Sequence, residues 1–340
     1  MTRTVNISLC SLFVVLWSSG WIGSKYGVGL VGPFTFLTWR YLIVVIILAT
    51  LVLALGHWKP LSRKEWILHL NTGLLSHGLY LGASLTAMDY GMSAGMVALV
   101  TSMQPLFTAI CAHYLIGERS NRRQWVGILI GFIALLGTIV NQLVIGESTL
   151  SYVLLFTAVF ALTGATLMDR ANTLNADRGH KKPAPLLQTL LIHSMAALVF
   201  FALCGFSLEQ LETQWTSDFI LAILYMAIVV SIGSYGCLFI LLRRLPVVKV
   251  SALTYLTQST TMLLAWVFLG ETLSTAQWMG LAIVSCAVVI IHSGQSRHVA
   301  SDELIPESES GPMPKPVSKP MPALNVRASV GNQRRETFTS

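Results

Sequence analysis

Ten apolar segments follow one another along this chain, and each is about as long as a helix that crosses a membrane. The hydrocarbon core of a bilayer is about 30 Å thick and needs about 20 apolar residues per helix. Only 11% of the residues are charged, whereas a soluble domain carries about 25%. These features predict an all-α polytopic membrane protein and exclude an ordinary soluble enzyme. The predicted spans are 7–28, 34–56, 66–88, 94–116, 124–141, 150–168, 186–206, 219–241, 246–269 and 276–292.

The end of the chain, residues 297–340, has a different composition. It holds six of the 12 prolines and a single aromatic residue, Phe338. Such a segment buries too little apolar surface to offset the entropy of ordering it. We therefore expect a disordered cytoplasmic tail. Residues 1–142 and 143–296 then form two membrane domains with five spans in each.

The positions of the positive charges predict the orientation in the membrane. If the N-terminus is cytoplasmic, 20 of the 22 Lys and Arg residues lie in cytoplasmic segments, as the positive-inside rule requires. A missed or additional span would reverse every later loop, so we expect ten spans in a cell (inner) membrane, with both termini cytoplasmic. The net charge of +7 follows from this topology and does not indicate a nucleic-acid partner.

The first span also has features of a cleavable signal peptide. Arg3 precedes an apolar run that ends in the small residues Ser18–Gly20, as in a signal peptide with its cleavage site. The apolar sequence continues through Trp21 and Ile22. This continuation favours an uncleaved anchor.

A repeated pair of motifs indicates an internal duplication. The sequence Gly-Glu at 117–118 is followed by Gln-Trp-Val-Gly at 124–127, and the same pattern recurs 153 residues later, at 270–271 and 277–280. We expect Glu118 and Glu271 to stabilise the corners between helices by hydrogen bonds. Because five spans separate the two copies, the halves must have opposite orientations. Inverted repeats are typical of secondary transporters, which bind substrate between the halves near the middle of the membrane.

Together with the repeated motif, two further elements make the chain similar to the EamA family of the drug/metabolite transporter superfamily. They are Trp17–Gly20 in the first span and Gly32–Phe36, followed by Arg40, at the second. The second half departs from the pattern, since Gln258 stands where Pro105 would map. The resemblance covers the ten spans but not the tail. It implies a ten-helix inner-membrane carrier, often an exporter of amino acids or other small metabolites, without naming the substrate.

Two basic residues lie inside predicted spans, where a charge costs roughly 2.5–3.5 kcal/mol on insertion scales. Arg40 lies seven residues after Pro33, ~10 Å along the helix and too deep for easy snorkelling. Lys25, near the outer end of its span, either snorkels to the interface or contacts substrate. With Asp89, these residues predict an outer cluster in which Asp89 pairs with Arg40 until a substrate carboxylate displaces it.

His193 is related to Arg40 by the repeat offset of 153 residues. A lone histidine inside a span is usually a packing residue. Its symmetric position here favours a polar or proton-linked role, because histidine changes charge near neutral pH.

Polar and aromatic side chains in spans one, three, four and nine predict a central cavity. His77 and Tyr80 share one face of the third span, Trp17 lies on the first, and Tyr255 and Gln258 belong to a polar run in the ninth. Hydrogen bonding between helices is the alternative explanation for each of them. The predicted cavity suits a small zwitterion or another small metabolite.

Pro105, in the fourth span, has no N–H, so it predicts a helix break that frees backbone carbonyls at mid-membrane depth. The five cysteines all lie in apolar segments without metal-ligand spacing. We predict no catalytic residue, cofactor or metal. Glycine pairs such as Gly127 and Gly131 indicate close helix contacts and leave a homodimer open.

The sequence therefore predicts a secondary transporter that exports small metabolites such as amino acids by alternating access. Its partners are a small-molecule substrate and the lipid bilayer. Two alternatives stay open: a membrane-embedded enzyme acting on lipid-linked substrates, and a membrane scaffold that does not transport. Solute flux into vesicles separates the three.

Overall fold

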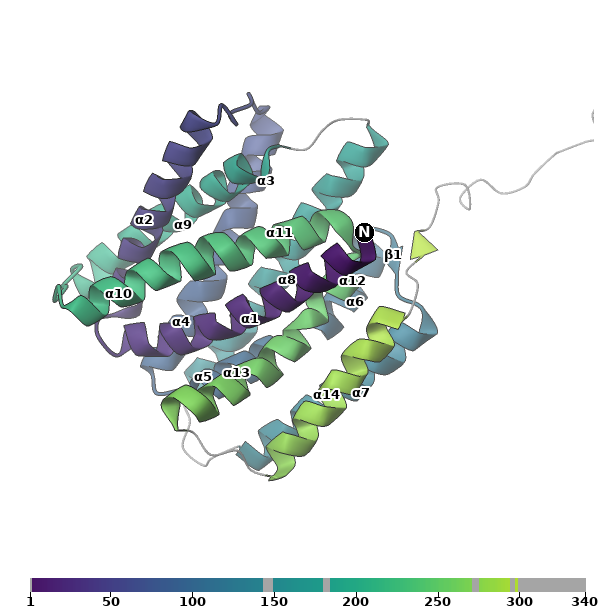
Figure 1. Ribbon diagram of the computed structural model, residues 1–340. Coiled ribbons are helices and arrows are strands. Elements are labelled where there is room, and N and C mark those ends of the chain that lie inside the picture. The colour runs from purple at the N-terminus through teal and green to yellow at the C-terminus, as the bar shows by residue number, and fades with distance from the viewer. Residues whose placement is uncertain (1, 143–148, 180–183, 271–274, 294–296, 299–340) are drawn as a thin grey trace, which may run out of the picture. The chain divides into compact units, whose positions relative to one another are not determined.

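The computed structural model describes a chain that is almost entirely helical (Figure 1). Apart from Arg297 and His298, the predicted tail lies outside the described residues, and so does Glu271. The described residues are 2–142, 149–179, 184–270, 275–293 and 297–298. The elements are α1 (Thr2–Val28), α2 (Pro33–Ala54), α3 (Arg63–Gly73), η1 (Leu74–Leu79), α4 (Tyr80–Asp89), α5 (Ala94–Thr101), α6 (Gln104–Leu115), β1 (Glu118–Arg119), α7 (Arg122–Gln142), α8 (Thr149–Arg178), α9 (Leu186–Glu209), α10 (Ser217–Tyr225), η2 (Met226–Ser234), α11 (Tyr235–Arg244), α12 (Val247–Ser251), α13 (Leu253–Leu269), α14 (Thr275–Ser293) and β2 (Arg297–His298).

Helical backbone is present at every predicted span. Within the described part of the chain, six helical stretches are long and apolar enough to cross a membrane, as expected for a polytopic membrane protein. The four other predicted spans are also helical over their described residues. The six stretches are Val5–Val28, Pro33–Ala54, Ala94–Leu115, Thr149–Ala176, Leu186–Glu209 and Ser217–Arg244.

Local sequence signals set the helix boundaries. Ser62 and Glu65 form a reciprocal capping box at the start of α3, which satisfies two backbone N–H groups that have no partner within the helix. Pro33 occupies the first position of α2, where its missing N–H costs nothing. Gly117 and Gly270 end their helices with φ of 69° and 68°, values that a side chain would make costly.

Four of the predicted spans are not continuous α-helices. The third and eighth spans each contain a π-helical segment, η1 (Leu74–Leu79) and η2 (Met226–Ser234). The fourth span is broken between Thr101 and Gln104, so that Pro105 lies in the first turn of α6. The ninth span is broken between α12 and α13. π-Helices are rare and occur often at functional sites.

The helices pack in pairs that join distant parts of the sequence. Helix α1 packs against η2 and α13, α8 packs against α4, α5 and α6, and α2 packs against α9. Figure 1 shows α7 and α14 side by side at one edge of the bundle. Their contact is close, since a Cβ on Gly127 would lie 2.8 Å from the carbonyl oxygen of Ala287. Gly127 and Gly131, which faces the ring of Tyr255, thus both contact other helices of the same chain.

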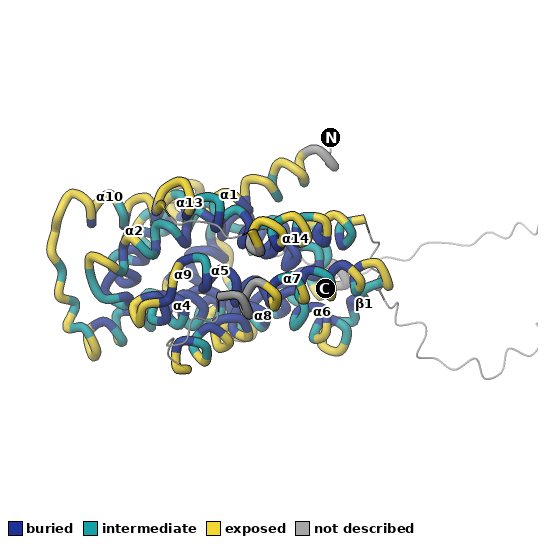
Figure 2. Tube along the Cα trace, turned by 90° about the horizontal axis from the view of Figure 1, so that it is seen from below, coloured by how far each residue is buried: buried dark blue, intermediate teal, exposed yellow. Residues whose placement is uncertain are grey.

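The bundle buries polar groups and exposes apolar ones. Arg40, His77, His193 and Gln104 are all at most 1% exposed. Figure 2 shows exposed residues along the outer sides of the helices. Many of the exposed residues are large and apolar, such as Val289 in α14, which is 70% exposed. This pattern is that of a membrane protein, whose polar groups face the interior and whose outer faces meet lipid.

Candidate functional site

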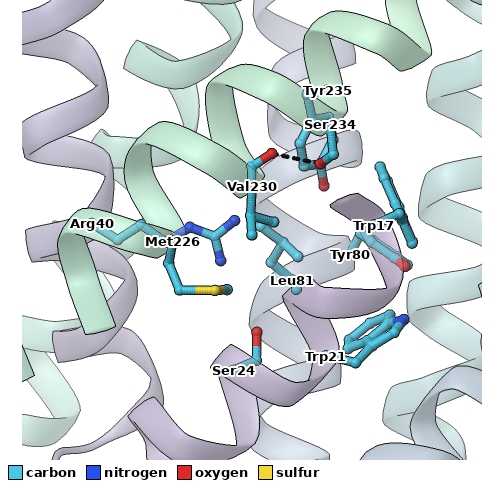
Figure 3. A pocket seen from close by; sticks show the side chains of 11 residues that line it. Trp17, Trp21, Ser24, Arg40, Tyr80, Leu81, Met226, Val230, Ser234 and Tyr235 are labelled. Carbon is cyan, nitrogen blue, oxygen red and sulfur yellow. Dashed lines mark hydrogen bonds between the residues drawn. The ribbon is translucent and has the colours of Figure 1, made fainter. Parts of the chain in front are cut away.

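A small cavity lies between α1, α2, α4 and the η2–α11 helix (Figure 3). Its volume is about 20 Å³, enough for about one water molecule. The structure is therefore closed around this point. The lining residues are Trp17, Gly20, Trp21, Ser24, Arg40, Tyr80, Leu81, Met226, Val230, Ser234 and Tyr235.

Aromatic rings form most of one wall. The ring of Trp17 lies 4.9 Å from that of Tyr235 and 5.9 Å from that of Tyr80. Trp21 meets Tyr80 edge to face at 5.9 Å. Rings in these arrangements attract one another and present flat faces that carry partial negative charge. Such a wall suits an aliphatic, aromatic or ammonium group of a ligand.

Arg40 brings the one positive charge to this cavity. Its guanidinium is 1% exposed and points among Met226, Val230 and Ser24 in Figure 3. Nε donates a hydrogen bond to Ser231 Oγ at 2.8 Å, whereas Nη1 has no hydrogen-bond partner. Among the described residues, no carboxylate lies within 4.0 Å of it. A buried guanidinium with so few partners is ready to bind a carboxylate.

The start of α2 fixes the depth of Arg40. The Glu209 side chain accepts hydrogen bonds from the backbone N–H groups of Phe34 at 3.0 Å and Thr35 at 2.6 Å. A carboxylate at a helix N-terminus is stabilised by the unpaired N–H groups there. Because α2 begins at Pro33, the helical rise puts Arg40 ~10 Å further along the axis.

Three of the predicted site residues meet at the cavity, namely Trp17, Tyr80 and Arg40. Lys25 and Asp89 do not. Lys25 Nζ donates to the carbonyl oxygens of Met88 at 3.4 Å and Met92 at 3.1 Å.

Asp89 ends α4 with its side chain exposed. Burial, and then the negative charge of Glu209, raise the pKa of Asp89, while Lys25 opposes them. The expected ion pair between Asp89 and Arg40 is not formed in this structure. The reason is depth, since Arg40 is buried inside the bundle and Asp89 lies at a helix end.

The polar run of the ninth span lies away from the cavity. Tyr255 donates its hydroxyl hydrogen to the carbonyl oxygen of Ile128 on α7 at 3.1 Å. Gln258 is 3% exposed, and its side-chain oxygen has no hydrogen-bond partner. Tyr255 therefore makes the hydrogen bond between helices that was the alternative explanation for these polar residues.

Histidines form a second cluster behind the cavity. The Tyr41 hydroxyl lies 2.6 Å from His77 Nδ1, and the His77 ring stacks on Tyr235 with centroids 3.9 Å apart. His193 Nε2 lies 3.3 Å from His69 Nδ1. His77 thus reaches the cavity through Tyr235, and His193 through His77. Among the described residues, no group of three His, Cys, Asp or Glu side chains is placed to hold a metal ion.

The sequence reasoning missed the contribution of the eighth span. Ser231, Ser234 and Tyr235 are buried there, and the last two line the cavity. The available signal was their spacing of three and four residues in an otherwise apolar span, which puts polar groups on one helix face.

It also missed an ion pair at the opposite end of the bundle. Glu118 Oε1 accepts a hydrogen bond from Arg170 Nε at 2.7 Å, and Oε2 accepts from the backbone N–H of Val247 at 3.0 Å. Glu118 therefore fixes more than its own corner, because it holds the start of α12. The sixth span was predicted to end at residue 168, whereas α8 continues to Arg178. Arg170 was therefore placed in a loop, and its contact with Glu118 was not predicted.

Known proteins with similar sequences are membrane transporters by name. A "Probable amino-acid metabolite efflux pump" of Salmonella typhimurium is 28% identical over 83% of this chain and 93% of its own length. An "Uncharacterized inner membrane transporter YedA" of Escherichia coli strain K12 is 24% identical over 85% and 90%.

A solved crystal structure shares the fold, with a TM-score of 0.67 and 20% identity over 84% of this chain and 97% of that chain. The EamA-like transporter family matches twice, at residues 5–140 and 154–293. These two matches take in most of both predicted membrane domains. The chain belongs to the EamA-like transporter family.

Proposed function

We propose that this protein is a secondary transporter that exports small metabolites, amino acids foremost, by alternating access. Ten spans form two inverted five-helix repeats, with both termini in the cytoplasm of the cell. The repeats close in turn around the cavity at Arg40. Family membership and the names of the relatives support transport rather than an enzymatic activity.

The packing of the helices supports the inverted repeat. Moving five spans along the chain exchanges α1 with α8, the third span with the eighth and the fourth with the ninth. Helix α1 packs on the eighth and ninth spans, as α8 does on the third and fourth. The π-helices begin at Leu74 and Met226, an offset within one residue of that between the repeated motifs. The breaks in the fourth and ninth spans also correspond.

The observation that carries the proposal is the buried guanidinium of Arg40, whose Nη1 has no hydrogen-bond partner, at a cavity lined by both halves. Residues from α1, α2 and α4 belong to the first half, and those from η2 and α11 to the second. A site shared between repeats is the arrangement that lets two halves rock around one substrate. The present volume of about 20 Å³ is smaller than an amino acid, so the cavity would have to widen in such a cycle.

The chemistry of the cavity suits an amino acid. Arg40 would bind its carboxylate, Trp17 and Tyr80 would face its ammonium or side chain, and Ser234 would supply a polar contact. The name of the Salmonella relative refers to the same substrate class. Lys25 and Asp89 would act at the outer entrance, and Gln258 would contact substrate only when the cavity widens.

Counterflow in reconstituted vesicles tests this function. Vesicles loaded with an unlabelled mixture of the L-amino acids are diluted into the same mixture labelled with ¹⁴C, and label entry is followed. We expect saturable entry with the wild-type chain, and a loss of at least tenfold in Arg40→Gln. Arg244→Gln, which alters an exposed arginine at the end of α11, should behave as wild type. No entry with wild type, or equal entry with Arg40→Gln, would contradict the proposal.

A further inference from the structure

We propose that Tyr41, His77, His193 and His69 form a proton pathway that leads from the cavity to His69, in the middle of α3. The proposal rests on the transport function above and adds its driving force. Through this pathway, a pH gradient would drive the movement of substrate.

The pathway begins beside Arg40. Ser231 accepts a hydrogen bond from Arg40 Nε at 2.8 Å and interacts with the hydroxyl of Tyr41. The Tyr41 hydroxyl lies 2.6 Å from His77 Nδ1, and both residues are at most 1% exposed. A substrate carboxylate that engages Arg40 would therefore act within two side chains of the first histidine.

The pathway continues across three helices. The rings of His77 and His193 have centroids 6.2 Å apart. His77 Nε2 and His193 Nδ1 are buried without a hydrogen-bond partner, and the proposed pathway places one bridging water between them. His193 Nε2 then lies 3.3 Å from His69 Nδ1. His69 is 2% exposed and sits one turn from Glu65, in the first turn of α3.

Each transfer breaks one bond to hydrogen and forms another. Tyr41 accepts a proton from the cavity side and gives its own to His77 Nδ1. His77 releases its Nε2 proton through water to His193 Nδ1, and His193 passes its Nε2 proton to His69 Nδ1. His69 releases its Nε2 proton toward Glu65, one turn nearer the start of α3. One proton enters and one leaves, and each ring then carries its proton on Nδ1. A half-turn of each ring points that N–H along the pathway again and presents Nε2 as the next acceptor.

Charged groups on neighbouring elements face this pathway. Arg40 on α2 acts on His77, and Arg243 on α11 acts on His193 and His69. Glu65 on α3 faces His69, Asp169 on α8 faces Arg243, and the Tyr235 ring covers His77. Two cations at opposite ends repel a proton that lingers on any ring. Such a field favours passage along the histidines over storage.

Close packing holds the histidines in register. A Cβ on Gly73 would lie 2.4 Å from the Cα of His193, so the backbones of α3 and α9 approach more closely here than any side chain allows. His77 lies on η1, directly after this contact. The π-helix turns His77 toward His193 while Tyr235 donates its hydroxyl hydrogen to the Ser76 carbonyl oxygen at 2.8 Å.

The test compares proton flux with substrate flux in the same vesicles. The full chain is reconstituted with the pH dye pyranine in the lumen, and an outward gradient of the ¹⁴C-labelled L-amino-acid mixture is imposed. With wild type, we expect substrate efflux to drive proton entry. In His193→Gln and in Tyr41→Phe, the ratio of proton flux to substrate flux should fall at least tenfold. His113→Gln, a histidine of α6 outside the pathway, should keep the wild-type ratio.

The outcomes separate the two proposals. Wild-type substrate flux without proton flux would overturn the pathway and leave the transport function intact. An unchanged ratio in His193→Gln and Tyr41→Phe would show that the histidines serve packing alone. If wild type moves no amino acid, the transport proposal fails and the pathway fails with it. Two chemically different variants guard against the misfolding of either one.

Discussion

Replacing Arg40 by methionine should make the protein more stable while it removes transport. The guanidinium is 1% exposed, and its Nε gives one hydrogen bond of 2.8 Å while Nη1 has no partner. Burying an ion costs several kcal/mol even after relaxation, and a hydrogen bond from a charged donor returns about 1.5–3 kcal/mol. Methionine keeps the apolar stem and removes the charge. We expect a gain in the free energy of unfolding of about 1–4 kcal/mol.

Arg170→Met is the matched control with the opposite sign. Arg170 is 8% exposed, but it bonds Glu118 at 2.7 Å and the Leu242 carbonyl oxygen at 3.0 Å. Its loss removes the guanidinium that bonds the buried Glu118 carboxylate and should cost about 3–5 kcal/mol.

Thermal unfolding of the purified chains in detergent measures both effects. Each kcal/mol corresponds to about 2–4 °C for a chain somewhat smaller than this one, so the two variants should shift Tm in opposite directions. If Arg40→Met lowers Tm as Arg170→Met does, Arg40 is a structural residue. The proposal that Arg40 Nη1 donates a hydrogen bond to substrate would then be refuted.

Three further substitutions test the packing around the site. Gly73→Ala brings a Cβ to 2.4 Å from the Cα of His193 and should lower the free energy of unfolding by roughly 1–3 kcal/mol. In the control Gly236→Ala, the nearest neighbour of the new Cβ is at 4.0 Å, and the free energy of unfolding should rise by up to about 1 kcal/mol. Equal Tm shifts in the two variants would contradict the close approach of α3 and α9 at Gly73. Glu209→Gln weakens the carboxylate contacts of 3.0 and 2.6 Å to the start of α2, so amide exchange there should accelerate roughly fivefold for a loss of about 1 kcal/mol; undiminished protection would argue against the contact. Tyr255→Phe removes a hydrogen bond of 3.1 Å to α7 and should cost about 0.5–1.5 kcal/mol without changing the KM of counterflow, and a raised KM would return this residue to the substrate site.

Hydropathy was sufficient to place the helices, because a bilayer imposes a length and an apolar composition on each span. It also singled out Arg40, because a charge inside a span is costly. Tyr80 was selected for the face that it shares with His77, and Trp17 for its place in the first span. The structure places these three residues at the cavity, and their contact with substrate stays a prediction. The family match agrees with the resemblance that these elements and the repeated motif indicated.

The remaining features depend on tertiary packing or on hydrogen-bond register. Hydropathy carries no signal for a π-helix, so neither η1 nor η2 was predicted. His69 looks like an ordinary polar residue near a helix start until α9 brings His193 against it at 3.3 Å. Asp89 was assigned to Arg40 because both lie toward the outer side, but the sequence does not report the difference in their depths.

Two carboxylates bind helix starts at opposite ends of the bundle. Glu209 holds the start of α2, and Glu118 holds the start of α12. In Figure 1, β1, which contains Glu118, and α10, which follows Glu209, lie at opposite ends of the bundle. In a transport cycle, opening the protein to one side of the membrane would break the hydrogen bonds of one carboxylate and keep those of the other. Their difference in strength would then set the relative populations of the inward-open and outward-open states, and hence which side of the membrane an empty carrier faces between substrates.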